Sequence, residues 1–76
     1  MKTKFAAYDD FNGKIAATHR TMKAAVISQN RLNHKLAIYG FSAIYTVVAI
    51  DDDGARWMTG DELVDLDITQ WEVDSN

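Results

Sequence analysis

The sequence contains no cysteine, which excludes disulfide bonds and cysteine-based zinc sites. It also lacks any apolar run that approaches the length of a membrane-spanning helix. The first five residues include two lysines, but no long apolar region follows them, so we expect no secretory signal. These absences favour a soluble cytoplasmic protein.

Motifs of the common enzyme classes are missing as well. We find no Gly-x-Ser-x-Gly, no His-Glu-x-x-His and no glycine-rich phosphate loop. Three adjacent aspartates precede Gly54, but a calcium-binding EF-hand loop needs alternating acidic positions and a later Glu. We interpret residues 51–54 as a solvated turn, and we expect no catalytic residue, no cofactor and no metal site.

What the chain does contain is enough for one small domain. It has 76 residues, and 47% of them are apolar, which is a normal share for a globular protein. A chain of this length buries only a modest core, so helix–sheet packing or oligomerisation must supply its stability. We expect a single domain over residues 1–76.

Residues 22–39 are predicted to form the only long helix. They include neither Gly nor Pro and are rich in good helix formers. Thr21 suits the N-cap position, and Gly40 suits the left-handed position after the last turn. At 100° per residue Met22 and Leu36 share one face, which we expect to pack on a sheet.

Two short strands, 4–8 and 14–19, are expected before the helix. The Asn12-Gly13 pair between them is a strong hairpin signal because both residues tolerate positive φ. The side chains predicted to face the core from this hairpin are Phe5, Ala7, Ile15 and Ala17.

The C-terminal half is predicted to add three more strands. Residues 42–50 are rich in β-branched and aromatic residues, which indicates a central strand, and an Asp-Gly turn leads into a return strand at 55–58. Capping-box spacing indicates a short helical turn from Thr59 to Val64. Residues 67–73 then alternate well enough for an edge strand.

The expected order of elements is therefore β-β-α-β-β-β. It predicts an α+β fold in which an antiparallel sheet carries one long helix on one face. Trp57 and Trp71 both fall on expected strands, which favours places in the core or on a sheet face.

Charge is divided unevenly between the two halves. Residues 1–38 carry seven Lys or Arg against two Asp, a net charge of +5, whereas residues 39–76 carry one Arg against nine Asp or Glu, a net charge of −8. Such asymmetry indicates a charged partner. The alternative is that the two halves interleave in one domain and partly neutralise each other.

The solvent side of the predicted helix is the first candidate contact surface. Ile27 and Ile38 lie away from Met22 and Leu36, and two isoleucines on a wet face are unusual as a pair. Apolar anchors around an arginine are typical of protein interfaces. The predicted partner-binding residues here are Lys23, Ile27, Arg31, His34, Lys35 and Ile38. The alternative is an ordinary basic face with two incidental isoleucines.

The acidic half provides a second candidate surface. Its predicted partner-binding residues are Asp51, Asp52 and Asp53, with further carboxylates at Asp61, Glu62, Asp65 and Asp67. These carboxylates would take the positions of nucleic-acid phosphates on a target protein, and so bind its basic, nucleic-acid-binding surface by charge complementarity. The alternative is an acidic rim that serves solubility.

Two other kinds of partner are open. As an alternative function, a small homodimeric structural or adaptor module would bury Ile27 and Ile38 against a second copy across a two-fold axis. Direct nucleic-acid binding would use basic residues on or just before the helix: Arg20, Lys23, Arg31 and Lys35. The acidic net charge of −3 and the absence of a nucleic-acid-binding motif disfavour this last hypothesis.

In size, acidity, lack of cysteine and order of elements, the whole chain resembles the small α+β anti-CRISPR proteins of phages and mobile elements. No shared motif carries functional residues over. The resemblance implies a non-catalytic, phage-encoded inhibitor that acts in the host-cell cytoplasm and blocks guide or target access to a CRISPR effector complex. The predicted partner is therefore a host protein or ribonucleoprotein complex, bound by protein–protein contact.

Overall fold

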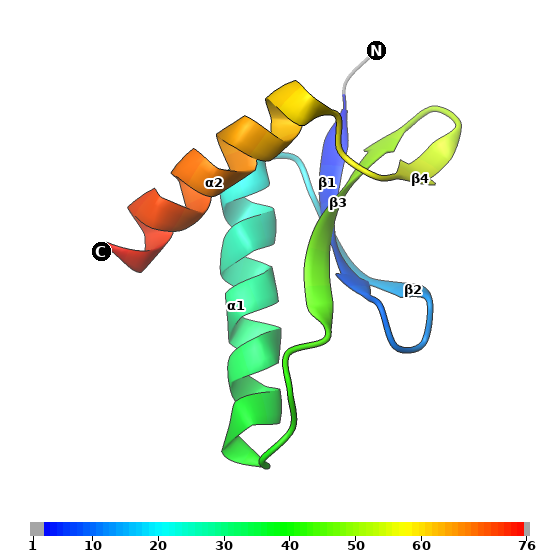
Figure 1. Cartoon of the computed structure of the whole chain (residues 1–76). Coiled ribbons are helices and arrows are strands. Elements are labelled where there is room, and N and C mark those ends of the chain that lie inside the picture. Colours follow the sequence, from blue (N-terminus) through cyan, green and yellow to red (C-terminus); the bar gives the residue numbers. More distant parts are fainter. Residues whose placement is uncertain (1–2, 76) are drawn as a thin grey trace.

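The computed structural model describes residues 3–75 and shows a four-stranded sheet with two helices on one side (Figure 1). The elements follow the chain in the order β1 (Lys4–Asp9), β2 (Lys14–His19), α1 (Met22–Ile38), β3 (Tyr45–Asp51), β4 (Gly54–Arg56) and α2 (Gly60–Asp74). The predicted α+β class and antiparallel sheet are confirmed. The predicted fifth strand is wrong.

The sheet is antiparallel throughout, with the strand order β2-β1-β3-β4. The first hairpin turns as expected, because Gly13 has φ 71° and donates its N–H to the Asp9 carbonyl at 2.8 Å. A register shift between Ala7 and Tyr8 places Ile15 opposite Tyr8. Ile15 therefore lies on the open face of the sheet and is 44% exposed, not in the core as predicted.

Helix α1 begins and ends where its sequence signals indicate. The Thr21 hydroxyl accepts a hydrogen bond from the Ala24 N–H at 3.2 Å. At the other end Gly40 has φ 81°, and the Phe41 N–H donates to the Leu36 carbonyl at 2.9 Å. This is the Schellman ending that a left-handed glycine permits.

The core between α1 and the sheet is built from small side chains. Ala25, Val26 and Val47 form its centre, and Val26 is the largest side chain that is fully buried. Ala7 and Ala49 on the sheet are completely buried as well. Alanines on both surfaces let the helix approach the strands closely, but they leave little apolar volume inside.

The segment predicted as an edge strand, 67–73, belongs to helix α2. A capping box at Thr59 and Glu62 starts this helix, as the spacing indicated, but the helix runs on to Asp74. Leu66 and Val73 lie two turns apart on its inner side and pack against the core cluster. Figure 1 shows α2 lying across α1.

Candidate interaction surface

The α1 face comprises the six predicted residues Lys23, Ile27, Arg31, His34, Lys35 and Ile38, and the structure leaves all of them exposed. Ile27 is 40% exposed and Ile38 is 67% exposed. Successive residues of the row Ile27, Arg31, His34 and Ile38 are three or four positions apart. This spacing places the row on the side of α1 opposite the buried residues Ala25, Val26 and Gln29. The sequence therefore identified this face correctly as a solvent-exposed one.

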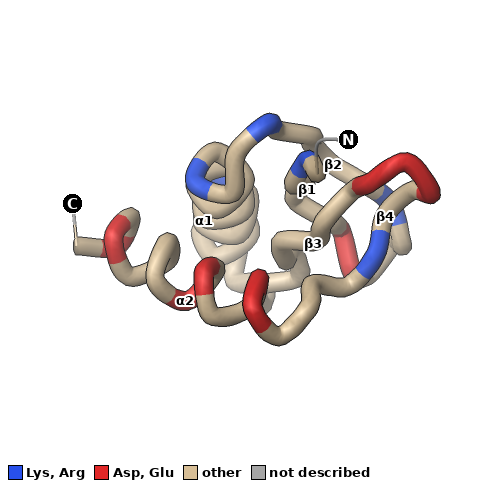
Figure 2. Tube along the Cα trace, turned by 90° about the horizontal axis from the view of Figure 1, so that it is seen from above, with Lys and Arg blue, Asp and Glu red and all other residues tan. Residues whose placement is uncertain are grey.

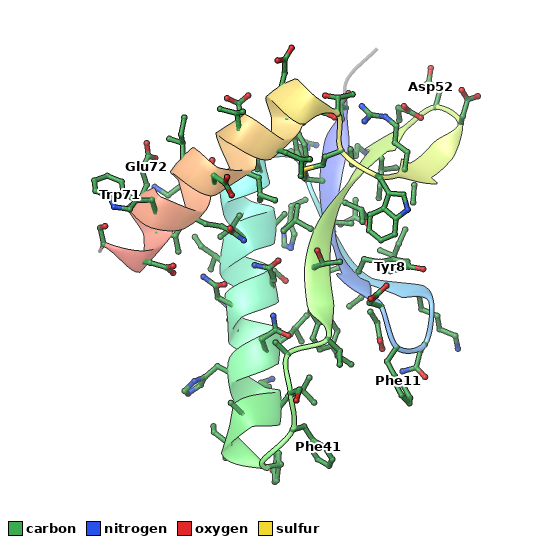
Figure 3. All side chains as sticks on the ribbon, in the orientation of Figure 1. Tyr8, Phe11, Phe41, Asp52, Trp71 and Glu72 are labelled. Atoms are coloured by element: carbon green, nitrogen blue, oxygen red, sulfur yellow. The ribbon has the colours of Figure 1, made fainter. Side chains whose placement is uncertain are left out.

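The three predicted aspartates lie elsewhere, in the turn between β3 and β4. Figure 3 shows Asp52 at the tip of this hairpin, on the other side of the sheet from α1. Asp52 and Asp53 are exposed, whereas Asp51 is partly buried and accepts a hydrogen bond from the Asp53 N–H at 3.1 Å. The structure does not bring these aspartates together with the α1 face.

Asp51 belongs to an ion-pair cluster that was not predicted from the sequence. We call this cluster the Arg56 clamp (Asp51, Arg56 and Glu62). Arg56 Nε lies 2.7 Å from Asp51 Oδ2, and its Nη1 and Nη2 lie 2.7 and 3.1 Å from the two oxygens of Glu62. Glu62 Oε1 also accepts from the Thr59 N–H at 2.9 Å. One guanidinium therefore ties the β3–β4 hairpin to the first turn of α2.

The clamp sets the charge state of its carboxylates. Hydrogen bonds from Arg56, and then from the Thr59 N–H, lower the pKa of Glu62 to about 2. Hydrogen bonds from Arg56 and the Asp53 N–H lower the pKa of Asp51 as well. Both carboxylates therefore already pair with a cation within the molecule, and their part in partner binding stays a prediction.

Beyond the clamp, the solvent side of α2 carries an exposed apolar strip, the α2 stripe (Val64, Ile68 and Trp71). These residues are 59%, 52% and 70% exposed. They are spaced i, i+4 and i+7, so they share one side of the helix, opposite Leu66 and Val73. Figure 3 shows Trp71 projecting away from α1. This stripe has no neighbour among the described elements to cover it.

Carboxylates border the α2 stripe on both sides. At 100° per residue Asp67 falls on one side of it, and Asp61 and Asp65 fall on the other. All three are exposed, and Figure 2 shows the acidic segments running along α2. The surface thus combines apolar anchors at its centre with a negatively charged rim, the layout of a protein-binding site.

The distribution of large apolar side chains over the described residues supports this interpretation. The buried core consists of alanine and valine, while the exposed set includes Phe11, Ile15, Ile27, Ile38, Tyr39, Phe41, Trp57, Leu63, Val64, Ile68 and Trp71. Scattered exposed apolar residues are normal, but an aligned row is typical of a surface that meets a partner.

The open face of the sheet holds a smaller aromatic feature. The rings of Tyr8 and Trp57 meet edge to face, with centroids 6.1 Å apart. They line a shallow hollow together with Val48, Ala55 and Arg56. Trp57 therefore lies next to a sheet face as predicted, whereas the prediction for Trp71 is wrong because that residue lies on α2.

The α2 stripe had a signal in the sequence that the strand prediction obscured. Thr59 and Glu62 mark a helix start, and Val64, Ile68 and Trp71 follow with helical spacing. The alternation of Trp71 with Val73 favoured a strand instead. A longer window would have placed Leu66 and Val73 on the inner side and the stripe on the outer side.

Comparison with family models, curated proteins and solved structures gave no match. Within residues 3–75 no cluster of three or more His, Cys, Asp or Glu side chains is arranged to hold a metal ion. Neither described helix is long and apolar enough to cross a membrane.

Proposed function

We propose that this chain is a non-catalytic binding protein and that the α2 stripe with its carboxylate rim is the surface that contacts its partner. The observation that carries this proposal is the row of Val64, Ile68 and Trp71, exposed and aligned on a helix whose opposite side already packs in the core. Aromatic and aliphatic anchors of this kind supply most of the binding energy in protein interfaces.

The charge of the rim points to the chemistry of the partner. Asp61, Asp65 and Asp67 surround the apolar anchors with negative charge, so a basic surface on the partner fits them. A nucleic-acid-binding groove is such a surface, because it is built to receive phosphates. The proposed partner is a host nucleic-acid-processing complex, and the proposed role is that of an anti-CRISPR-like, phage-encoded inhibitor.

The α1 face stays a second predicted contact surface with the opposite charge. Its Lys23, Arg31 and Lys35 suit an acidic partner and do not suit a basic groove. For this reason the α2 stripe, rather than the α1 face, supports the inhibitor hypothesis best.

Affinity capture from host lysate with paired variants tests the proposal. Wild-type chain is expected to recover a nucleic-acid-binding protein. High salt should release this protein because it screens the charge pairing, and an added oligonucleotide should release it because its phosphates bind the same basic surface. Ile68→Asp is expected to lose this capture, whereas Phe11→Asp, at an exposed position on the β1–β2 turn, is expected to keep it. Capture that survives Ile68→Asp would show that α2 is not the contact surface. Capture that the oligonucleotide does not affect would show that the partner is not bound through a nucleic-acid-binding surface.

A further inference from the structure

Two helices of the same chain carry exposed apolar rows with opposite charges. The α1 face sets Ile27 and Ile38 among Lys23, Arg31 and Lys35. The α2 stripe sets its three apolar residues between Asp67 on one side and Asp61 and Asp65 on the other. Each surface therefore presents what the other would need in a partner: apolar side chains to bury and charges of the opposite sign to pair.

These two surfaces do not meet within one molecule. Figure 2 shows the basic segments at the start of α1 on the side of that helix away from α2, while the acidic segments follow α2 itself. Lys23, Arg31 and Lys35 form no ion pair with any described residue, while Arg56 pairs with Asp51 and Glu62. Both surfaces are thus free for a contact between molecules.

The α2 stripe is short enough to lie within the length of the α1 face. From Ile27 to Ile38 a helix rises roughly 16 Å, and from Val64 to Trp71 it rises roughly 10 Å, at 1.5 Å per residue. The three anchors of the α2 stripe therefore fit between the two isoleucines of the α1 face. Arg31, midway along that face, would meet the carboxylate rim, and Arg and Trp are the residue types most often dominant in interfaces.

We propose that the protein self-associates by docking the α2 stripe of one copy on the α1 face of another. The contact joins two different surfaces, so it is heterologous, and an open assembly keeps one unused α1 face at one end and one unused α2 stripe at the other. Wild-type chain is therefore expected to grow in size with concentration, and to shrink at high salt, where charge pairing is screened.

Self-association also regulates the surface to which the proposed function assigns the partner, and this regulatory part rests on that proposal. A copy whose α2 stripe is covered by a second copy has no free stripe for a basic target. The target and the α1 face of another copy therefore compete. Raising the concentration of the protein is expected to lower the fraction of copies with a free stripe, so that capture of the target rises less than in proportion to concentration.

The test uses two variants that each lose one of the two surfaces. Ile68→Asp disrupts the α2 stripe, and Ile27→Asp combined with Arg31→Glu disrupts the α1 face. All three positions are exposed, so the variants are expected to fold, which far-UV circular dichroism checks. Each variant alone is expected to be monomeric in light scattering, with association at least tenfold weaker than wild type. The two mixed together are expected to form a one-to-one complex, because one intact surface of each kind is then present. Phe11→Asp serves as the matched control and is expected to associate like wild type.

Three outcomes would overturn the inference: a wild-type chain that stays monomeric at millimolar concentration, variants that associate like wild type, or a mixture that remains monomeric. The Ile27→Asp/Arg31→Glu chain also separates this inference from the proposed function, because it keeps an intact α2 stripe. If wild type is monomeric but this variant still captures its target, only the self-association fails. If wild type self-associates but shows no Ile68-dependent capture, only the proposed target binding fails.

Discussion

Arg56 donates hydrogen bonds to both carboxylate oxygens of Glu62, six residues later in the chain, at 2.7 and 3.1 Å. The contact joins the end of β4 to the first turn of α2, and Glu62 also caps that helix through Thr59. Because the α2 stripe lies on this helix, the direction in which the stripe faces depends on the clamp.

Substitutions at Glu62 are expected to separate the charge of the clamp from the helix cap. Glu62→Gln keeps the hydrogen bond to the Thr59 N–H but loses the ion pair, whereas Glu62→Ala loses both. The cap alone is expected to contribute about 1 kcal/mol to the free energy of unfolding. Thermal unfolding should therefore rank wild type above Glu62→Gln and Glu62→Gln above Glu62→Ala. Equal stability of the three chains would show that neither contact matters.

Acid is expected to destabilise the protein through the same carboxylates. The folded-state pKa of Glu62 is lowered from 4.5 to about 2, and the pKa of Asp51 is lowered as well. The stabilisation is therefore complete above the ordinary pKa values and is lost as pH falls toward 2. The melting temperature measured from neutral pH downward is expected to drop most steeply below pH 4.5. Glu62→Gln should flatten that drop, and an unchanged slope in this variant would contradict the role of Glu62.

Hydrogen bonds of the Asn33 side chain connect α1 to the beginning of β3. Its Nδ2 donates to the Tyr45 carbonyl at 3.0 Å, and its Oδ1 accepts from the Ile44 and Tyr45 N–H groups at 3.1 and 2.9 Å. Asn33→Ala leaves these partly buried backbone groups without partners, at an expected loss of about 2 kcal/mol in unfolding free energy. Asn30→Ala, whose side chain makes only contacts of 3.3 and 3.5 Å, is the matched control with an expected loss below about 0.5 kcal/mol. Similar losses in urea unfolding would contradict this assignment.

Two glycines are expected to respond in opposite directions to the same substitution. Gly40 has φ 81° at the end of α1, so alanine there is strained, and Gly40→Ala is expected to cost about 1 kcal/mol. Gly60 lies at the start of α2 with open space around it and no positive φ, so Gly60→Ala is expected to gain about 0.5 kcal/mol. Thermal unfolding of the two variants checks both signs, and a stabilising Gly40→Ala would contradict the left-handed ending.

The sequence predicted the parts of the fold that local chemistry decides. Asn12-Gly13 marked the first turn, and Thr21 and Gly40 marked the ends of α1, because each of these signals acts through neighbouring backbone groups. The face of α1 that stays exposed followed from helical spacing alone. The register shift beside Tyr8 left no such local signal, so the exposure of Ile15 was predicted wrongly.

The features that the sequence did not predict depend on contacts between distant segments. Residues 67–73 were predicted as an edge strand from their alternation, whereas in α2 the inner residues Leu66 and Val73 pack against the core cluster. The ion pairs of the Arg56 clamp were not predicted because they join Arg56 of β4 to two other elements, β3 and α2. Both affect the candidate site: the wrong strand hid the α2 stripe, and the ion pairs show that Asp51 and Glu62 already contact Arg56.

The exposure of Trp71 provides the most direct test of the claim that the α2 stripe is a binding surface. In a Trp57→Phe chain, Trp71 is the only tryptophan, and it is 70% exposed in the free molecule. Acrylamide quenching of its fluorescence is measured in the free protein and in complex with the captured partner or, at high concentration, with a second copy. We predict a blue-shifted emission and at least a twofold fall in the quenching constant on binding, roughly what burial of an exposed indole at an interface produces. Unchanged quenching in a complex that light scattering shows to be formed would contradict the claim.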